Sequence, residues 1–89
     1  MHYVYVLWNQ VRCEFYVGFT SDLKRRLAEH MSDKVHTTKR YESLRLIFYE
    51  AFSSKSDAIR REQYLKTSKG KKTLRLMLRE STKAETKTT

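Results

Sequence analysis

Five polar side chains in this 89-residue chain are of the types that could together hydrolyse a phosphodiester: Tyr5, Tyr16, Arg26, His30 and Glu62. A phenolic oxygen and an imidazole can move protons. A guanidinium can stabilise a pentavalent phosphate, and a single carboxylate can hold a hard divalent ion that keeps most of its waters. Such chemistry requires all five at one site, so the elements that carry them must converge.

The two tyrosines belong to β-branched and aromatic segments, 3–8 and 15–19, that are typical of strands. Only a short loop at 9–12 separates the segments, which predicts an antiparallel hairpin. Gly18 is expected to share the strand face of Tyr16 and to leave room for a phosphodiester to approach the backbone. The alternative is that the tyrosines only stabilise the hairpin as cross-strand aromatic residues.

A first helix is predicted to follow, capped by Thr20 or Ser21 and ending near Met31. On the helical wheel His30 lies about 20° from Leu23, within the apolar stripe, and Arg26 flanks it. The two polar residues are four positions apart, so both can project to one site. The alternative is that His30 only caps the helix end and Arg26 extends over the edge of the core.

A second helix is predicted over 57–68, after a capping segment at 53–56. Glu62 falls about 40° from Ala58 on this helix and therefore inside its apolar sector. A buried carboxylate needs a cation, hydrogen bonds or a metal. The alternative is that Glu62 lies at the rim and pairs with a nearby Arg or Lys.

The rest of the chain completes a small α+β domain over residues 1–80. Segment 44–52 reads as a third strand and 71–80 as a last helix, with Gly70 placed as a helix-ending residue. The last helix is expected to bury Leu74, Met77 and Leu78, and residues 81–89 form a polar, disordered tail. The order β-β-α-β-α-α predicts a three-stranded antiparallel sheet flanked by helices.

Composition bounds the function. The chain carries 19 Lys+Arg against 10 Asp+Glu, a net charge of +9, which favours a polyanionic partner. Its length excludes a two-domain enzyme or a dinucleotide-binding fold. No signal peptide is visible and no apolar run approaches the roughly 20 residues that span a bilayer. The single cysteine, Cys13, forms no internal disulfide and reads as a structural residue in a strand-like run, so we expect a cytoplasmic or nucleoid location.

The sequence resembles the GIY-YIG nuclease domains. Segments 3–5 (YVY) and 16–18 (YVG) match the two halves of the motif, with a separation between Tyr5 and Tyr16 that is typical of the family. Segment 20–30 resembles the helix that carries the family's arginine, and segment 58–62 resembles the helix with its metal-binding glutamate. The resemblance covers about residues 2–79 and is closest to small stand-alone bacterial members. Tyr3 replaces the motif's Gly and Val4 replaces its Ile.

The resemblance implies a role for each candidate residue. It makes Tyr5 the general base for the attacking water, Tyr16 a residue that orders water and phosphate, Arg26 the stabiliser of the scissile phosphate, His30 an aid to proton transfer, and Glu62 the ligand of Mg²⁺ or Mn²⁺. Further basic and polar residues are expected to contact the nucleic acid: Lys24, Arg25, Thr38, Lys39 and Arg40. For the last three the alternative is a solvated loop.

We therefore predict a metal-dependent DNA endonuclease or nickase that acts in DNA repair or processing. Branched, damaged and single-stranded DNA are the candidate substrates, a partner protein could supply targeting, and monomer and weak homodimer both stay open. The alternatives are a basic nucleic-acid-binding module without catalysis and an accessory protein whose charge is incidental. The five residues favour the nuclease, because a binding module has no need of Glu62 in an apolar sector.

Overall fold

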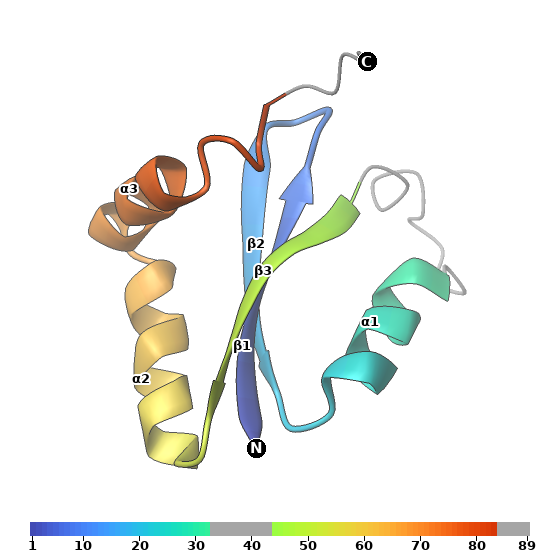
Figure 1. Ribbon diagram of the computed structural model, residues 1–89, viewed down its shortest axis with the longest axis vertical. Helices are drawn as coiled ribbons and strands as arrows, with labels where there is room; N and C mark the ends of the chain where they lie inside the picture. Colours follow the sequence, from blue (N-terminus) through green and yellow to red (C-terminus); the bar gives the residue numbers. More distant parts are fainter. Residues whose placement is uncertain (33–43, 84–89) are drawn as a thin grey trace.

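The computed structural model describes residues 1–32 and 44–83 as one antiparallel sheet with helices on both faces (Figure 1). The elements are β1 (His2–Asn9), β2 (Glu14–Thr20), α1 (Leu23–Ser32), β3 (Leu44–Phe52), α2 (Lys55–Leu65) and α3 (Ser68–Met77). The three strands lie in the order β2-β1-β3, which makes β2 an edge strand. The predicted α+β fold and its element order are confirmed.

The alternation of side chains along the central strand β1 gives the sheet two buried faces. Val4 and Val6 pack against α2 and α3, whereas Tyr5 and Leu7 pack on the face that α1 covers. Figure 1 shows the same division, with α2 and α3 on one side of the sheet and α1 on the other. Side chains from α1 and from α2 can therefore meet only around an edge of the sheet.

The β1–β2 hairpin fixes which residues of the two strands are neighbours. Tyr5 is opposite Gly18 and Leu7 is opposite Tyr16, so these four residues share the face that α1 covers. The neighbours of Cys13 predict a strand at this position, but Cys13 lies outside β1 and β2. It is an exposed residue of the connecting turn, with a positive φ of 54°, and its amide donates to the carbonyl of Asn9 at 2.7 Å.

Hydrogen bonds to the first backbone amides of α1 and α2 identify the residues that cap these helices. In α1 the carboxylate of Asp22 accepts from the amide of Arg25 at 3.1 Å, so Asp22, and neither Thr20 nor Ser21, caps the helix. The Thr20 hydroxyl instead accepts from the amide of Asp22 at 3.1 Å. In α2 the cap is Ser54, inside the predicted capping segment.

Gly70 does not end a helix but lies in the first turn of α3. Thr67 caps α3 through a hydroxyl that accepts from the amide of Gly70 at 3.0 Å. A Cβ at position 70 would overlap the backbone of Tyr64 and Leu65. Gly70 is therefore needed because α3 begins in close contact with the end of α2.

The buried side of α3 also differs from the prediction. Leu74 and Leu78 are buried as expected, but Met77 is 44% exposed. Gly70, Leu74 and Leu78 are spaced by four residues and lie along one buried face, and Met77 is about 100° from Leu78 and lies off that face.

Some expectations fall outside the described residues. Thr38, Lys39 and Arg40 are among them, as are residues 84–89 of the predicted tail. The start of that tail, 81–83, contacts the domain, since the Arg45 guanidinium donates to the carbonyl of Ser81 at 2.9 Å. Within 1–32 and 44–83, none of the helices has the length and apolar character needed to cross a membrane.

Candidate active site

A pocket of about 500 Å³ lies at the β2 edge of the sheet, and all five candidate side chains line it: Tyr5, Tyr16, Arg26, His30 and Glu62. The first four belong to the sheet face that α1 covers or to α1 itself, whereas Glu62 comes from α2 on the other face. The edge strand is the place where the two faces can meet. The structure thus brings the five residues together, and their chemical roles are a matter for proposal.

Tyr5 is the centre of the polar contacts in the pocket. Its side chain is only 3% exposed, and its hydroxyl accepts a hydrogen bond from Nε of Arg26 at 3.2 Å. The same hydroxyl lies 3.1 Å from Nε2 of His30. Because Arg26 can only donate, the proton of the Tyr5 hydroxyl is directed to His30 when the imidazole carries its own proton on Nδ1.

Gly18 makes space for Tyr5 and not for substrate. A Cβ at position 18 would overlap the ring and the hydroxyl of Tyr5. The expectation that Gly18 leaves room for a phosphodiester is therefore wrong, because the phenol ring fills that space. The pairing of these two residues across β1 and β2 explains why the strand carries a glycine there.

The surroundings of Arg26 and His30 set their charges. Burial, and then the positive charge of Arg26, lower the pKa of His30 below its ordinary 6.5, so His30 is neutral at pH 7. The pKa of Arg26 is raised, first by its hydrogen bond with Tyr5 and then by that with Glu29. Glu29 accepts from Nη1 of Arg26 at 2.9 Å, which holds the guanidinium beside Tyr5.

Tyr16 forms part of the pocket wall next to Leu7. Its hydroxyl donates to Oε1 of Glu14 at 3.2 Å. This contact points the Tyr16 hydroxyl at a carboxylate outside the Tyr5–Arg26–His30 group. Tyr16 therefore lines the pocket through its ring and is not bonded to Tyr5.

Glu62 lies on the α2 side of the pocket with a side chain that is 17% exposed. Its Oε2 forms an ion pair with Nζ of Lys66 at 2.8 Å, which is the arrangement foreseen by the alternative reading. Lys66 also lines the pocket, and the sequence analysis missed it. The spacing of four residues on one helix could have revealed it.

The donor set at Glu62 suits a hard divalent cation that needs few protein ligands. Within 1–32 and 44–83, no group of three or more His, Cys, Asp or Glu side chains could hold an ion. Mg²⁺ binds through one or two carboxylates and substrate phosphates while it keeps several waters. The single carboxylate of Glu62 fits such an ion, provided that Lys66 gives way.

Lys24 and Arg25, the two predicted nucleic-acid contacts that lie within the described residues, do not line this pocket. Lys24 lines a different pocket, with Tyr3 and Tyr49. Arg25 is held by two carboxylates on its own helix segment, Asp22 at 3.5 Å and Glu29 at 3.2 Å. Neither residue is brought to the five candidate side chains.

Comparison with known proteins identifies the class. The family model of the GIY-YIG catalytic domain matches residues 1–75, and the chain belongs to this family, which has a nuclease-type fold. This confirms the resemblance drawn from the two tyrosine segments and the two helices. No solved structure gives a significant match to the chain.

The relatives are small proteins of similar length. The chain is 36% identical over 80 residues to a UPF0213 protein of Staphylococcus haemolyticus, covering 85% of this chain and 93% of the relative. It is 40% identical over 70 residues to a UPF0213 protein of Halobacterium salinarum, covering 74% and 86% of the two chains. A UPF0213 protein of Limosilactobacillus reuteri is 40% identical over 68 residues, covering 73% and 70%.

Proposed function

We propose that this protein is a metal-dependent endonuclease that hydrolyses phosphodiester bonds of DNA. The observation that carries the proposal is the Tyr5 hydroxyl, which is held between Arg26 and His30 inside a pocket that also contains Glu62. Membership in the GIY-YIG family supports the same reaction class.

The contacts of Tyr5 define a route for the proton of the attacking water. Neutral His30 accepts the hydroxyl proton of Tyr5 on Nε2, while the Tyr5 oxygen accepts a proton from water. The water oxygen then forms a bond to phosphorus, and the bond from phosphorus to the leaving oxygen breaks. The leaving oxygen takes up a proton from solvent, and His30 releases its extra proton to solvent, which restores the starting state of the site.

Arg26 and, through a bound cation, Glu62 are the residues that stabilise the negative charge on the scissile phosphate in this proposal. The hydrogen bonds of Arg26 to Tyr5 and Glu29 use only part of its donor set, and its side chain is 46% exposed, so the guanidinium can contact the scissile phosphate. Glu62 would hold a divalent cation, Mg²⁺ or Mn²⁺, whose positive charge offsets the charge that develops on the phosphate.

The proposed substrate is DNA. The net charge of +9 favours a phosphate backbone as partner, and contacts to phosphates carry no sequence information. We therefore expect low sequence specificity and a preference set by DNA structure, in a role in DNA repair or processing in the cytoplasm.

A non-catalytic basic module that binds nucleic acid is the second candidate. The observation that favours it is the ion pair between Glu62 and Lys66, which neutralises the carboxylate in the pocket. Under this alternative Glu62 is a structural residue, and DNA is bound without being cut.

The two candidates differ in a nicking assay. Purified protein is incubated with supercoiled, branched and single-stranded DNA in Mg²⁺, Mn²⁺ or EDTA. The nuclease proposal predicts strand breaks in one of the metals, none in EDTA, and loss of the activity in Glu62→Ala. DNA binding without breaks in any metal would support the module instead.

A further inference from the structure

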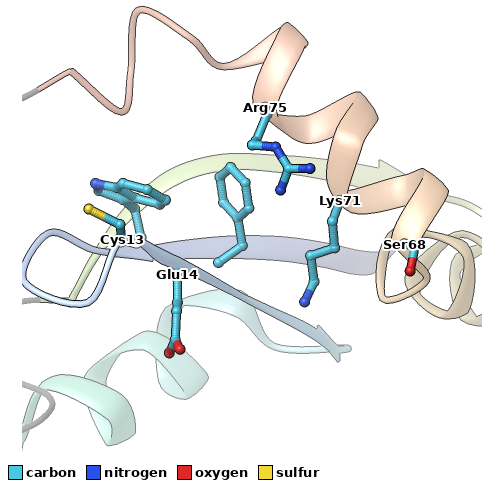
Figure 2. A pocket seen from close by; sticks show the side chains of 7 residues that line it. Cys13, Glu14, Ser68, Lys71 and Arg75 are labelled. Atoms are coloured by element: carbon cyan, nitrogen blue, oxygen red, sulfur yellow. The ribbon is translucent and has the colours of Figure 1, made fainter.

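A second pocket, of about 550 Å³ (Figure 2), is lined by residues that directly precede those of the candidate active site on β2. The first pocket is lined by residues 16–19 of β2, and the second by residues 13–15 at the start of that strand and in the turn before it. On the helical side the first pocket takes Ile59, Glu62 and Lys66, and the second takes Ser68, Lys71 and Arg75. The two pockets are therefore consecutive along β2, and they are also consecutive along the helices, the first at α2 and the second at α3.

The second pocket carries two cationic side chains, Lys71 and Arg75, that form no ion pair among the described residues. Lys71 and Arg75 are one helical turn apart on α3 and project toward β2 (Figure 2). Neither has a carboxylate partner within residues 1–32 and 44–83. Glu14 also lines the pocket, but its carboxylate binds Arg12 at 3.8 Å and Tyr16 at 3.2 Å.

The floor of the pocket is aromatic. The rings of Trp8 and Phe15 lie 5.0 Å apart at an interplanar angle of 53°, and the Phe15 side chain remains partly exposed. Cationic side chains beside an aromatic surface are the combination that binds a nucleic-acid strand, because phosphates contact the cations while sugars and bases contact the rings.

We propose that this second pocket binds the DNA strand that continues from the scissile phosphate, with Lys71 and Arg75 in contact with its backbone phosphates. The inference rests on the proposed function, since it assumes that the strand also occupies the pocket of Tyr5. The order of the two pockets along β2 gives the direction: the strand passes Tyr16 and then the β1–β2 turn.

A charge-matched pair of double variants tests the contacts. Lys71→Ala/Arg75→Ala removes two positive charges from the pocket. Lys69→Ala/Lys72→Ala removes two from exposed positions of the same helix that do not line it. In EDTA, fluorescence anisotropy with a labelled single strand should give a Kd about tenfold weaker or more for the first variant, and a smaller change for the second. For Lys71→Ala/Arg75→Ala, the slope of log Kd against log salt concentration should fall by roughly two, because two phosphate contacts are lost.

Cys13 supplies a second readout, independent of the binding constant. It is the single cysteine of the chain, is exposed, and lies on the pocket wall. Bound DNA should slow the reaction of Cys13 with the uncharged reagent N-ethylmaleimide. The protection should disappear in Lys71→Ala/Arg75→Ala and persist in Lys69→Ala/Lys72→Ala, while circular dichroism confirms that both variants are folded.

The outcomes separate this inference from the nuclease proposal. Equal weakening in both double variants, or DNA binding that leaves the Cys13 reaction unchanged, overturns the second pocket as a strand site. Cys13 protection that depends on Lys71 and Arg75 supports it even if no DNA is cut in any metal. Protection by inorganic phosphate alone at equal concentration would also overturn it, because the site would then be one for the free anion.

Discussion

The hydroxyl oxygen of Tyr5 lies 3.1 Å from Nε2 of His30, with the two rings edge to face at a centroid distance of 5.8 Å. The contact joins the central strand to α1 and is almost closed to solvent on the tyrosine side. Arg26 donates to the same oxygen, so with the imidazole proton on Nδ1 the order of the contacts is that Arg26 donates, Tyr5 relays and His30 accepts.

Tyr5→Phe should abolish most of the proposed activity without unfolding the protein. The substitution keeps the buried ring and removes only the oxygen that passes the proton, so we expect a loss of about 100-fold or more in the nicking rate. The unfolding free energy should change by about 1 kcal/mol. Tyr64→Phe is the matched control, because Tyr64 bonds Thr73 outside the pocket, and an equal loss of rate there would contradict the assignment.

Protonation of His30 should destabilise the fold below its ordinary pKa. Burial and Arg26 lower the pKa of His30 in the folded state, so between that value and about 6.5 the unfolded chain binds more protons. The contribution of His30 to stability is therefore complete above pH ~6.5 and is lost as the pH falls through the folded-state pKa.

Urea unfolding of wild type and His30→Gln measures this effect. The difference in unfolding free energy between the two proteins should be constant above pH ~6.5 and should shift against the wild type at lower pH. If the difference instead moved in favour of the wild type on acidification, protonated His30 would be stabilised in the fold by a negative charge. That result would contradict a pKa lowered by burial and by Arg26.

Gly18→Ala should destabilise the protein through Tyr5. The new methyl group would overlap the phenol ring, and we expect a cost of about 1–3 kcal/mol together with reduced activity. A double-mutant cycle with Tyr5→Ala tests the cause, because the cost of Gly18→Ala should shrink once the ring is absent. Additive effects of the two substitutions would place the strain elsewhere.

Two ion pairs of α2 should differ in their contribution to stability. Arg61 binds Glu50 of β3 through two nitrogens at 2.8 and 3.2 Å, with side chains only 30% and 27% exposed. Arg60 binds Asp57 within the helix, with side chains 72% and 53% exposed. Glu50→Gln should lower the unfolding free energy by about 1 kcal/mol, and Asp57→Asn by less. Chemical denaturation of both variants checks the order.

The sequence predicted the elements because their patterns are strong and local. The β-branched and aromatic residues of segments 3–8 and 15–19 and the spacing of Leu23 and Leu27 are read directly from the sequence. The tyrosine segments and the three polar helix positions, Arg26, His30 and Glu62, also indicated which residues would share one pocket. Their placement at the edge strand then follows from the strand order, which no local pattern contains.

The errors arose where a residue acts through a distant contact. Gly18 and Gly70 were interpreted from their neighbours in the chain, but each is required by a group on another element, the Tyr5 ring and the end of α2. For Cys13 the strand-like neighbours mislead, because the turn between β1 and β2 holds this residue at a positive φ through its bond to the Asn9 carbonyl. Local propensity does not encode such contacts.

The central claim is that Glu62 and Tyr5 act in one catalytic pocket, and the single-turnover nicking rate of Glu62→Gln in Mg²⁺ or Mn²⁺ tests it most directly. Glu80→Gln is the control, since Glu80 is an exposed carboxylate paired with Lys83. The account predicts a rate at least about 100-fold below wild type for Glu62→Gln and a wild-type rate for Glu80→Gln. Nicking by Glu62→Gln at the wild-type rate would contradict it.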